Sequence, residues 1–197
     1  MPARPGRNSE LHGNVADHAR TALLLIDVIN AFDFPGAEQL LEQALPMADE
    51  IERLRRAARA KKIPVIYAND NFGRWRSSFD TLIDSCAGKR GGAIVKKLAP
   101  HKNDYFVLKP KNSAFYTTTL DLVLAHIGVQ RLILAGWLGN NCVLFSANDA
   151  YMRDYKLSVP QDCVASIDPS DNAVALQQMK KVAKADISPW RKIKQLR

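Results

Sequence analysis

The chain has few cysteines and no long uninterrupted run of apolar residues. Its three cysteines, Cys86, Cys142 and Cys163, are an odd number and lie far apart. None belongs to a CxxC pair or has a histidine at the spacing of metal ligands. The sequence therefore supports neither a disulfide framework nor a zinc site.

Signals for a membrane or for secretion are also lacking. No stretch approaches the roughly 18 apolar residues that a membrane span needs, and the first twenty residues lack the apolar middle of a secretory signal. We expect a cytoplasmic protein with an N-terminal arm over residues 1–20. A single α/β domain over residues 21–197 would have an ordinary length for this class.

The net charge of +8 raises the question of acidic partners. Basic residues gather at 53–62, at 89–102 and in the C-terminal tail, and the first of these runs is typical of the solvated face of a helix. No zinc finger, helix-turn-helix or aromatic-basic RNA motif accompanies them. We expect a small-molecule substrate and neither a nucleic-acid nor a membrane partner.

Apolar runs of strand length alternate with segments of helical periodicity along the chain. This alternation predicts a parallel sheet with helices on both faces, joined by right-handed crossovers. The predicted strands cover 21–27, 64–70, 104–109, 131–137 and part of 155–164, with a sixth suggested at 185–188. The predicted helices cover 37–62, about 78–86, 120–128 ending at Gly128, 142–154, and 169–185 capped by Asp168 or Ser170.

Three chemically distinct side chains stand at the carboxyl ends of these predicted strands. Asp27 ends the first strand, Lys109 ends the third, and Cys142 follows the bend after the fourth. Ligands of such sheets bind beyond the carboxyl ends of the strands. A lone cysteine is more often a buried apolar residue, a strand-end Asp a helix cap, and a strand-end Lys a solvent-facing charge. Their convergence on one edge favours a catalytic site.

The three residue types suit nucleophilic catalysis. The thiolate is the nucleophilic form of cysteine, and we expect a helix N-terminus and the Lys109 ammonium to lower the pKa of the Cys142 thiol. Asp27 would take the thiol proton and return it to a leaving amine. Backbone N–H groups of the same bend would face the developing oxyanion.

Three segments, LLLIDVINAF, VLKPKNSAFYTTTLD and LILAGWLGNNCVLFSANDAYMRDY, resemble the signature segments of the isochorismatase-like cysteine hydrolases in order and spacing. The resemblance covers about residues 21–168. It implies a three-layer α/β/α fold with a six-stranded parallel sheet, assembled into homodimers or homotetramers. It also implies an Asp-Lys-Cys triad of Asp27, Lys109 and Cys142. Lys111 is a rival amine, but Lys109 keeps the family's spacing to Ser113-Ala114-Phe115.

The resemblance further implies the surroundings of the nucleophile. The oxyanion hole would consist of the N–H groups of Leu138 and Cys142, next to a non-proline cis peptide between Trp137 and Leu138. Relatives with a metal site carry histidines after the second strand, whereas YANDNFGRW has none, so no metal or other cofactor is expected. Gly139 replaces a common Thr and Ile29 a common Gln, which puts the usual substrate contacts in doubt.

Retention of the cysteine favours the branch of the family that cleaves carbon–nitrogen bonds. The predicted function is cofactor-free hydrolysis of an amide, carbamoyl or ureido bond through a thioester, and Arg74 or Lys111 would suit a substrate carboxylate. Two alternatives stay open: a hydrolase of an isochorismate-like vinyl ether that uses Asp27 as proton donor, and a non-catalytic binding protein. Position near the strand ends marks these substrate-binding candidates: Phe32, Asn69, Asn71, Arg74, Trp75, Trp137 and Phe145.

Overall fold

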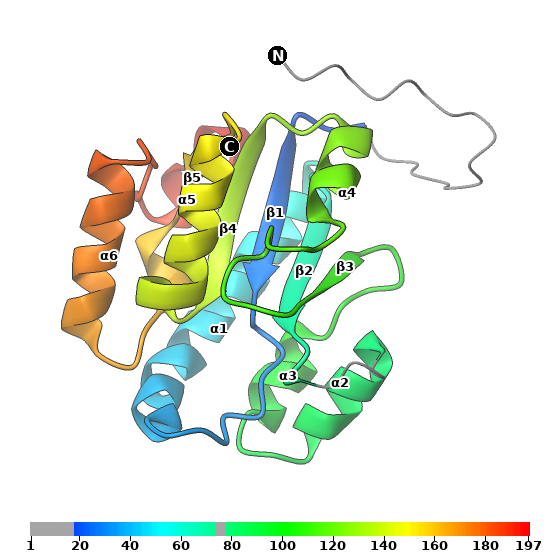
Figure 1. Ribbon diagram of the computed structural model, residues 1–197, viewed down its shortest axis with the longest axis vertical. Coiled ribbons are helices and arrows are strands. Elements are labelled where there is room, and N and C mark those ends of the chain that lie inside the picture. Colours follow the sequence, from blue (N-terminus) through cyan, green and yellow to red (C-terminus); the bar gives the residue numbers. More distant parts are fainter. Residues whose placement is uncertain (1–17, 74–77) are drawn as a thin grey trace.

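The computed structural model describes residues 18–73 and 78–197, and within them six parallel strands form one sheet between two layers of helices (Figure 1). The strand order is β3-β2-β1-β4-β5, and β6 pairs with the end of β4. The predicted three-layer α/β/α architecture is confirmed. The strands are β1 (Thr21–Ile26), β2 (Val65–Asp70), β3 (Tyr105–Lys109), β4 (Arg131–Trp137), β5 (Lys156–Ser158) and β6 (Val164–Ala165).

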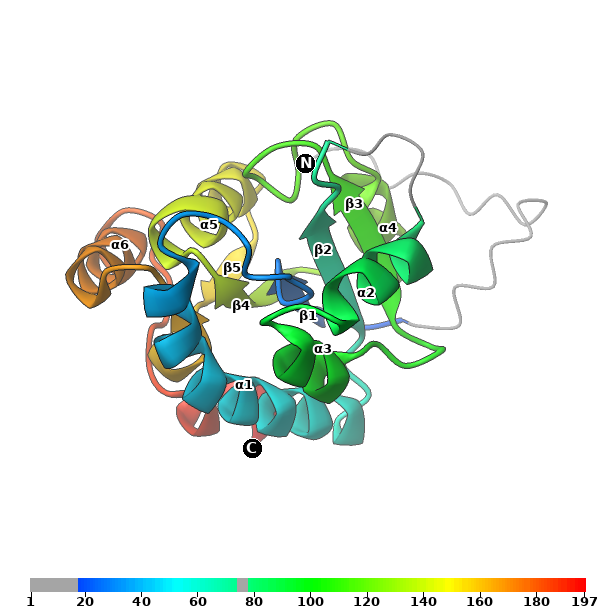
Figure 2. The same ribbon diagram turned by 90° about the horizontal axis from the view of Figure 1, so that it is seen from below.

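The helices divide between the two faces of the sheet, as the view from below in Figure 2 shows. One face packs against α1, α2 and α3, and the other against α4, α5 and α6. A π-helical turn, η1 (Gly139–Val143), leads directly into α5. The helices are α1 (Ala37–Ala60), α2 (Phe79–Ala87), α3 (Gly92–Leu98), α4 (Leu120–Ile127), α5 (Leu144–Met152) and α6 (Pro169–Lys181).

The central strand β1 shows why the sheet needs two helical layers. All six of its residues are buried. Leu23 and Leu25 face the cluster of α1, whereas Leu24 and Ile26 face the cluster of α4 and α5. Alternate side chains of a strand point to opposite faces, so an unbroken apolar strand is stable only when both faces are covered.

Strand order reverses at β1, and this reversal places the site. The chain runs from β1 to β2 and β3 on one side, then returns to β4 and β5 on the other. In parallel sheets of this kind, ligands bind at the carboxyl ends of the strands on either side of such a reversal, here β1 and β4. Asp27 directly follows β1 there, and η1 follows β4 after Leu138.

Several element boundaries differ from the sequence-based predictions. The sixth strand is Val164–Ala165 and not 185–188, where Asp186 makes only an isolated bridge to Ser158. A two-residue strand is too short to show a period. The short helix α3 was not predicted, and the last helix ends at Lys181, four residues early. The predicted Gly128 end is confirmed, with Gly128 in the left-handed region at φ 85°.

Candidate active site

The three residues predicted at the strand ends lie together in the structure. The Nζ atom of Lys109 is 2.9 Å from Oδ2 of Asp27 and donates to the Cys142 Sγ at 3.7 Å. Lys109 is the last residue of β3 and Asp27 directly follows β1. These two strands are not neighbours, because β2 lies between them. The long lysine side chain spans that gap, so one ammonium group contacts both the carboxylate and the sulfur.

Lys109 is completely buried, yet it keeps its charge. Burial alone would lower its pKa, but the carboxylates of Asp27 and Asp70 and the adjacent Cys142 outweigh this effect and raise the pKa of Lys109. Its Nζ atom also donates to the carbonyl of Lys111 at 3.2 Å. Lys111, the rival amine, therefore contributes its backbone oxygen to the site.

Asp27 is held from several sides. Its backbone lies in the left-handed region at φ 55°, and its N–H donates to the carbonyl of Ala68 at 2.9 Å. Its Oδ1 accepts the N–H of Asp70 at 2.8 Å while Oδ2 faces Lys109. The carboxylate is thus fixed by β2 and β3 together, and its backbone strain is of the kind that active sites store.

Asp70 is a component of the site that the sequence analysis missed. Its N–H orients Asp27, and its Oδ2 is 3.9 Å from Nζ of Lys109. The position of Asp70 at the end of a predicted strand was the available signal. Unlike Asp27 and Lys109, its side chain is about a third exposed, at 36%. It therefore places a second carboxylate between Lys109 and solvent.

The Cys142 thiol is neutral in this environment, which corrects the expected lowering of its pKa. Burial and the Asp27 carboxylate raise the pKa of the thiol to about 12, although Lys109 acts in the opposite direction. The lysine and the helix terminus alone would lower this pKa, but Cys142 is only 6% exposed and its desolvation has the larger effect. A base must therefore take the proton when the thiol reacts.

The turn that carries Cys142 is held by hydrogen bonds on several of its residues. The N–H groups of Asn141 and Val143 donate to the carbonyl of Leu138, at 2.9 and 3.2 Å. On the far side, the Ser146 hydroxyl donates to the carbonyl of Cys142 at 2.7 Å and accepts the N–H of Ala114 at 2.9 Å. Ser146 thus ties the turn to the loop that follows β3.

The expected cis peptide between Trp137 and Leu138 is not found; the described residues contain none. Leu138 takes a left-handed conformation instead, with φ 57° and ψ 62°. This residue redirects the chain from the end of β4 into η1, so the sharp change of direction is made by a left-handed dihedral pair.

A protein-family model of the isochorismatase domain matches residues 21–188, which contain the whole sheet and all three converging residues. This chain belongs to the isochorismatase family. The matched range agrees with the resemblance predicted from the three sequence segments.

Individual members of the isochorismatase family are similar over most of their length. The chain is 42% identical to the uncharacterized isochorismatase family protein YaaI of Bacillus subtilis, over 86% of this chain and 94% of that protein. It is 26% identical to the maleamate amidohydrolase of Pseudomonas putida, over 74% and 72% of the two chains. The crystal structure of N-carbamoylsarcosine amidase from Thermoplasma acidophilum has a TM-score of 0.68 at 26% identity and covers 89% of this chain and 99% of that one.

The predicted substrate-binding residues of this isochorismatase-family site have very different environments. Phe32 and Trp137 are completely buried, with ring centroids 6.3 Å apart. Asn69 is also buried and donates to the carbonyl of Ile29 at 2.7 Å, while Asn71 accepts the N–H of Gly73 at 2.9 Å. Phe145 is about half exposed on α5. Arg74 and Trp75 lie outside the described residues.

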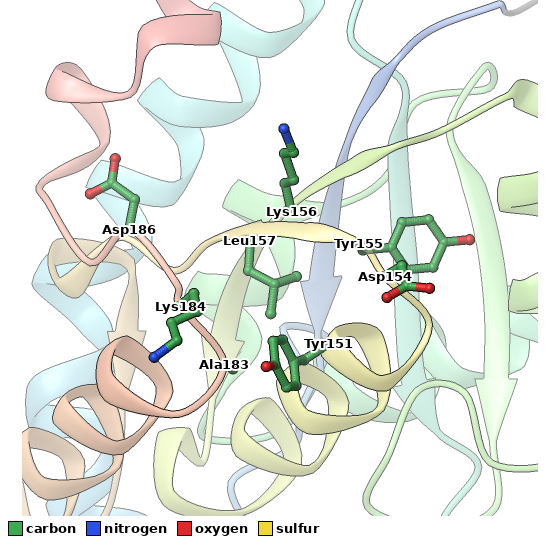
Figure 3. A pocket seen from close by; sticks show the side chains of 8 residues that line it. All are labelled: Tyr151, Asp154, Tyr155, Lys156, Leu157, Ala183, Lys184 and Asp186. Carbon is green, nitrogen blue, oxygen red and sulfur yellow. The ribbon is translucent and has the colours of Figure 1, made fainter. Parts of the chain in front are cut away.

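A separate cavity of about 410 Å³ lies near the amino ends of β4 and β5, away from Asp27, Lys109 and Cys142 (Figure 3). Leu157 of β5 and Ala183, just beyond α6, line it together with Tyr151, Asp154, Tyr155, Lys156, Lys184 and Asp186. Lys156, which lines the cavity, pairs with Arg131, the first residue of β4. Cys142 follows the last residue of β4, so the cavity and Cys142 lie at opposite ends of this strand. None of the predicted site residues lines this cavity.

Neither a membrane-spanning helix nor a metal-binding cluster occurs in the part of the chain that the structure describes. Among residues 18–73 and 78–197, no helix is long and apolar enough to cross a membrane. The same described residues contain no group of three or more His, Cys, Asp or Glu side chains arranged to hold a metal ion.

Proposed function

We propose that this isochorismatase-family protein is a cofactor-free cysteine hydrolase that cleaves a carbon–nitrogen bond of a small amide, carbamoyl or ureido compound. The observation that carries the proposal is the Lys109 ammonium, which contacts the Asp27 carboxylate and the Cys142 sulfur at once. The names of two relatives, maleamate amidohydrolase and N-carbamoylsarcosine amidase, support this reaction class.

The proposed reaction begins with a neutral thiol, whose proton passes to Asp27 as the Cys142 sulfur attacks the substrate carbonyl. Asp27 becomes a neutral acid, and Lys109 stabilises the negative charge that develops on the sulfur. The N–H groups of Leu138 and Cys142 are proposed to bind the oxyanion of the tetrahedral intermediate.

Breakdown of that intermediate releases the amine and leaves a thioester. The C–N bond breaks, and protonated Asp27 gives its proton to the departing nitrogen. Asp27 then accepts a proton from water as the water oxygen attacks the thioester. The C–S bond breaks, the sulfur regains the proton from Asp27, and the carboxylic acid leaves. The net reaction consumes one water.

The substrate-binding role of Phe32, Asn69, Asn71, Arg74, Trp75, Trp137 and Phe145 remains a prediction, and so does assembly into a homodimer or homotetramer. Phe145 and Met152 lie two turns apart on α5 and are 52% and 70% exposed. Such exposed apolar side chains support an interface between copies of the chain.

The test is ammonia release by the purified protein across a panel of small amides, carbamoyl and ureido compounds, with and without a chelator. We expect release from at least one compound, unaffected by the chelator. Alkylation mapped to Cys142 should abolish release, whereas Cys163→Ala, which removes a completely buried thiol, should not. Release that survives complete alkylation of Cys142, or that requires an added metal ion, would contradict the proposal.

A further inference from the structure

A buried chain of hydrogen bonds lies beneath the turn that carries Cys142. The backbone N–H of Asn140 donates to Oγ of Ser166 at 3.1 Å, and the Ser166 hydroxyl donates to Oδ1 of Asn172 at 3.0 Å. The amide nitrogen of Asn172 in turn donates to the carbonyl of Val164 at 3.0 Å. Ser166 is completely buried and Asn172 is 7% exposed. The chain therefore links η1 to β6 and α6 through direct hydrogen bonds.

Gly139 makes room for this arrangement. A Cβ atom at position 139 would lie 2.1 Å from Oδ1 of Asn172, 2.6 Å from Cγ1 of Val164 and 3.2 Å from Oγ of Ser166. The Asn172 carboxamide thus occupies the space that any side chain at 139 would need. Asn172 can pack against the turn in this position only because residue 139 has no side chain.

We propose that Ser166 and Asn172 are positioning residues that hold the nucleophile turn, so that the Cys142 sulfur stays against Lys109 and Asp27. This inference rests on the proposed function, in which Cys142 is the nucleophile.

Local geometry supports a positioning role. Asn140 is two residues before Cys142, and the first N–H groups of a helix have no partner within the helix. A π-helical turn is rare and needs support from outside itself. Ser166 supplies the acceptor for Asn140, and its own hydroxyl is oriented by Asn172. Hydrogen bonds that point in one direction along such a chain strengthen one another.

In the proposed reaction, these hydrogen bonds would hold the Cys142 sulfur in place. The 3.7 Å distance between Sγ of Cys142 and Nζ of Lys109 depends on the turn staying in place. Loss of the Ser166 side chain would free the Asn140 N–H, and loss of the Asn172 side chain would remove the acceptor that orients the Ser166 hydroxyl. Either change would let the turn shift toward solvent. A displacement of about 1 Å in a catalytic group is enough to reduce a rate substantially.

The test compares Ser166→Ala and Asn172→Ala with wild type by two readouts. We expect kcat on the amide identified above to fall by about tenfold or more while KM changes little. We also expect the pH midpoint for alkylation of Cys142 to fall, because a sulfur that moves toward solvent loses part of its desolvation. The double variant should be no worse than the poorer single variant.

Two matched controls separate positioning from general stability. Asp171→Ala removes an exposed contact, 3.4 Å from the Asn140 side chain, and should change neither readout. Met179→Ala removes a buried side chain two turns further along α6, so it should lower the melting temperature but leave the alkylation midpoint unchanged. If Asn172→Ala fails to fold, Ser166→Ala, which removes one oxygen, decides the matter.

Unchanged kcat and alkylation midpoint in folded Ser166→Ala would overturn the inference, as would an equal shift in Met179→Ala. Alkylation requires no substrate. A wild-type protein that hydrolyses no amide would contradict the proposed function, whereas the alkylation midpoints would still report whether Ser166 and Asn172 hold the turn.

Discussion

At the scale of single residues, the site depends on a balance of charges around one sulfur. The Asp27 carboxylate raises the pKa of the Cys142 thiol, after the larger effect of burial, and the Lys109 ammonium opposes both. A raised pKa leaves the resting thiol protonated, so the proposed mechanism requires proton transfer to Asp27 and not a preformed thiolate. In that mechanism Asp27 has two effects of opposite sign: its charge suppresses the free thiolate, and as a base it enables the reaction.

The first prediction separates these two effects with Asp27→Asn. Removing the negative charge should lower the pKa of Cys142, so alkylation by iodoacetamide at a fixed pH near 9 should become faster. Hydrolysis should nevertheless fall by about 10² to 10⁴, because Asn cannot accept the thiol proton. Alkylation rates and ammonia release on the same preparation check both signs.

Lys109→Ala is the matched comparison for that experiment. It removes the positive charge, so it should raise the pKa of Cys142 and slow alkylation, while hydrolysis also falls. If Asp27→Asn slowed alkylation as Lys109→Ala does, the assigned influence of the Asp27 carboxylate on the thiol would be wrong.

The convergence of Asp27, Lys109 and Cys142 could be predicted from the sequence, but the electrostatics of this candidate site could not. Asp27, Lys109 and Cys142 each follow or end a recognisable strand, which suffices to bring them to one edge of the sheet. The pKa of Cys142 depends on how completely the thiol is desolvated and on the orientation of a carboxylate that follows the neighbouring strand β1. Asp70 was missed because its backbone N–H, and not its side chain, makes the contact with Asp27.

At the scale of secondary-structure elements, β1 and β4 form the platform on which Asp27 and η1 rest. The two strands pair along their whole common length, from Thr21 opposite Arg131 to Ile26 opposite Gly136. Gly136 has φ 140°, and a Cβ atom there would lie 1.9 Å from the carbonyl oxygen of Ile26. Only glycine permits this approach, one residue before Asp27 on the neighbouring strand.

The second prediction is that Gly136→Ala disrupts this platform. The added methyl group must push β4 away from β1, so we expect the free energy of unfolding to fall by about 3 kcal/mol or more. Chemical denaturation with urea measures the loss. Gly88→Ala is the control, since Gly88 has φ −86° and open space around its Cα atom, and it should leave stability nearly unchanged. Equal stability of the Gly136 and Gly88 variants would refute the close-approach argument.

Elements with a strong hydrophobic period were the predictable ones. The apolar runs of β1 and β4 and the long periodic segment of α1 were located within one or two residues. The two-residue β6 and the short α3 carry too few residues to show a period. The π-helical turn is set by tertiary contacts, including Asn140 to Ser166 across the sheet edge, and no local pattern encodes it.

At the scale of the whole molecule, folding buries several groups that must remain protonated. The pKa of Cys142 rises from 9.0 to about 12 and that of Tyr67 from 10.0 to about 12, mainly through burial. Burial also raises the pKa of Cys163. Above pH 9 the unfolded chain releases these protons while the folded chain keeps them, so stability must fall as pH rises.

The third prediction is a loss of thermal stability between about pH 9 and pH 11, after a plateau nearer neutrality. Each such group contributes a slope of about 1.4 kcal/mol per pH unit in the range between its unfolded and folded pKa. Melting temperatures across this range test the direction. Cys163→Ala should make the decline shallower even though it lowers the starting stability. A melting temperature that is constant or rises up to pH 11 would be inconsistent with these buried groups.

We propose that Cys142 is the nucleophile and Asp27 its base. The measurement that tests this is the turnover of folded Cys142→Ala and of folded Asp27→Asn on the amide identified by ammonia release. Circular dichroism checks folding, and Cys163→Ala controls for loss of a buried thiol. Both site variants should lose nearly all hydrolysis, the double variant should be little worse than either, and the Cys163 variant should retain hydrolysis. Near-normal turnover by folded Cys142→Ala, with Asp27→Asn inactive, would contradict the thioester mechanism and favour acid catalysis by Asp27 alone, as in cleavage of a vinyl ether.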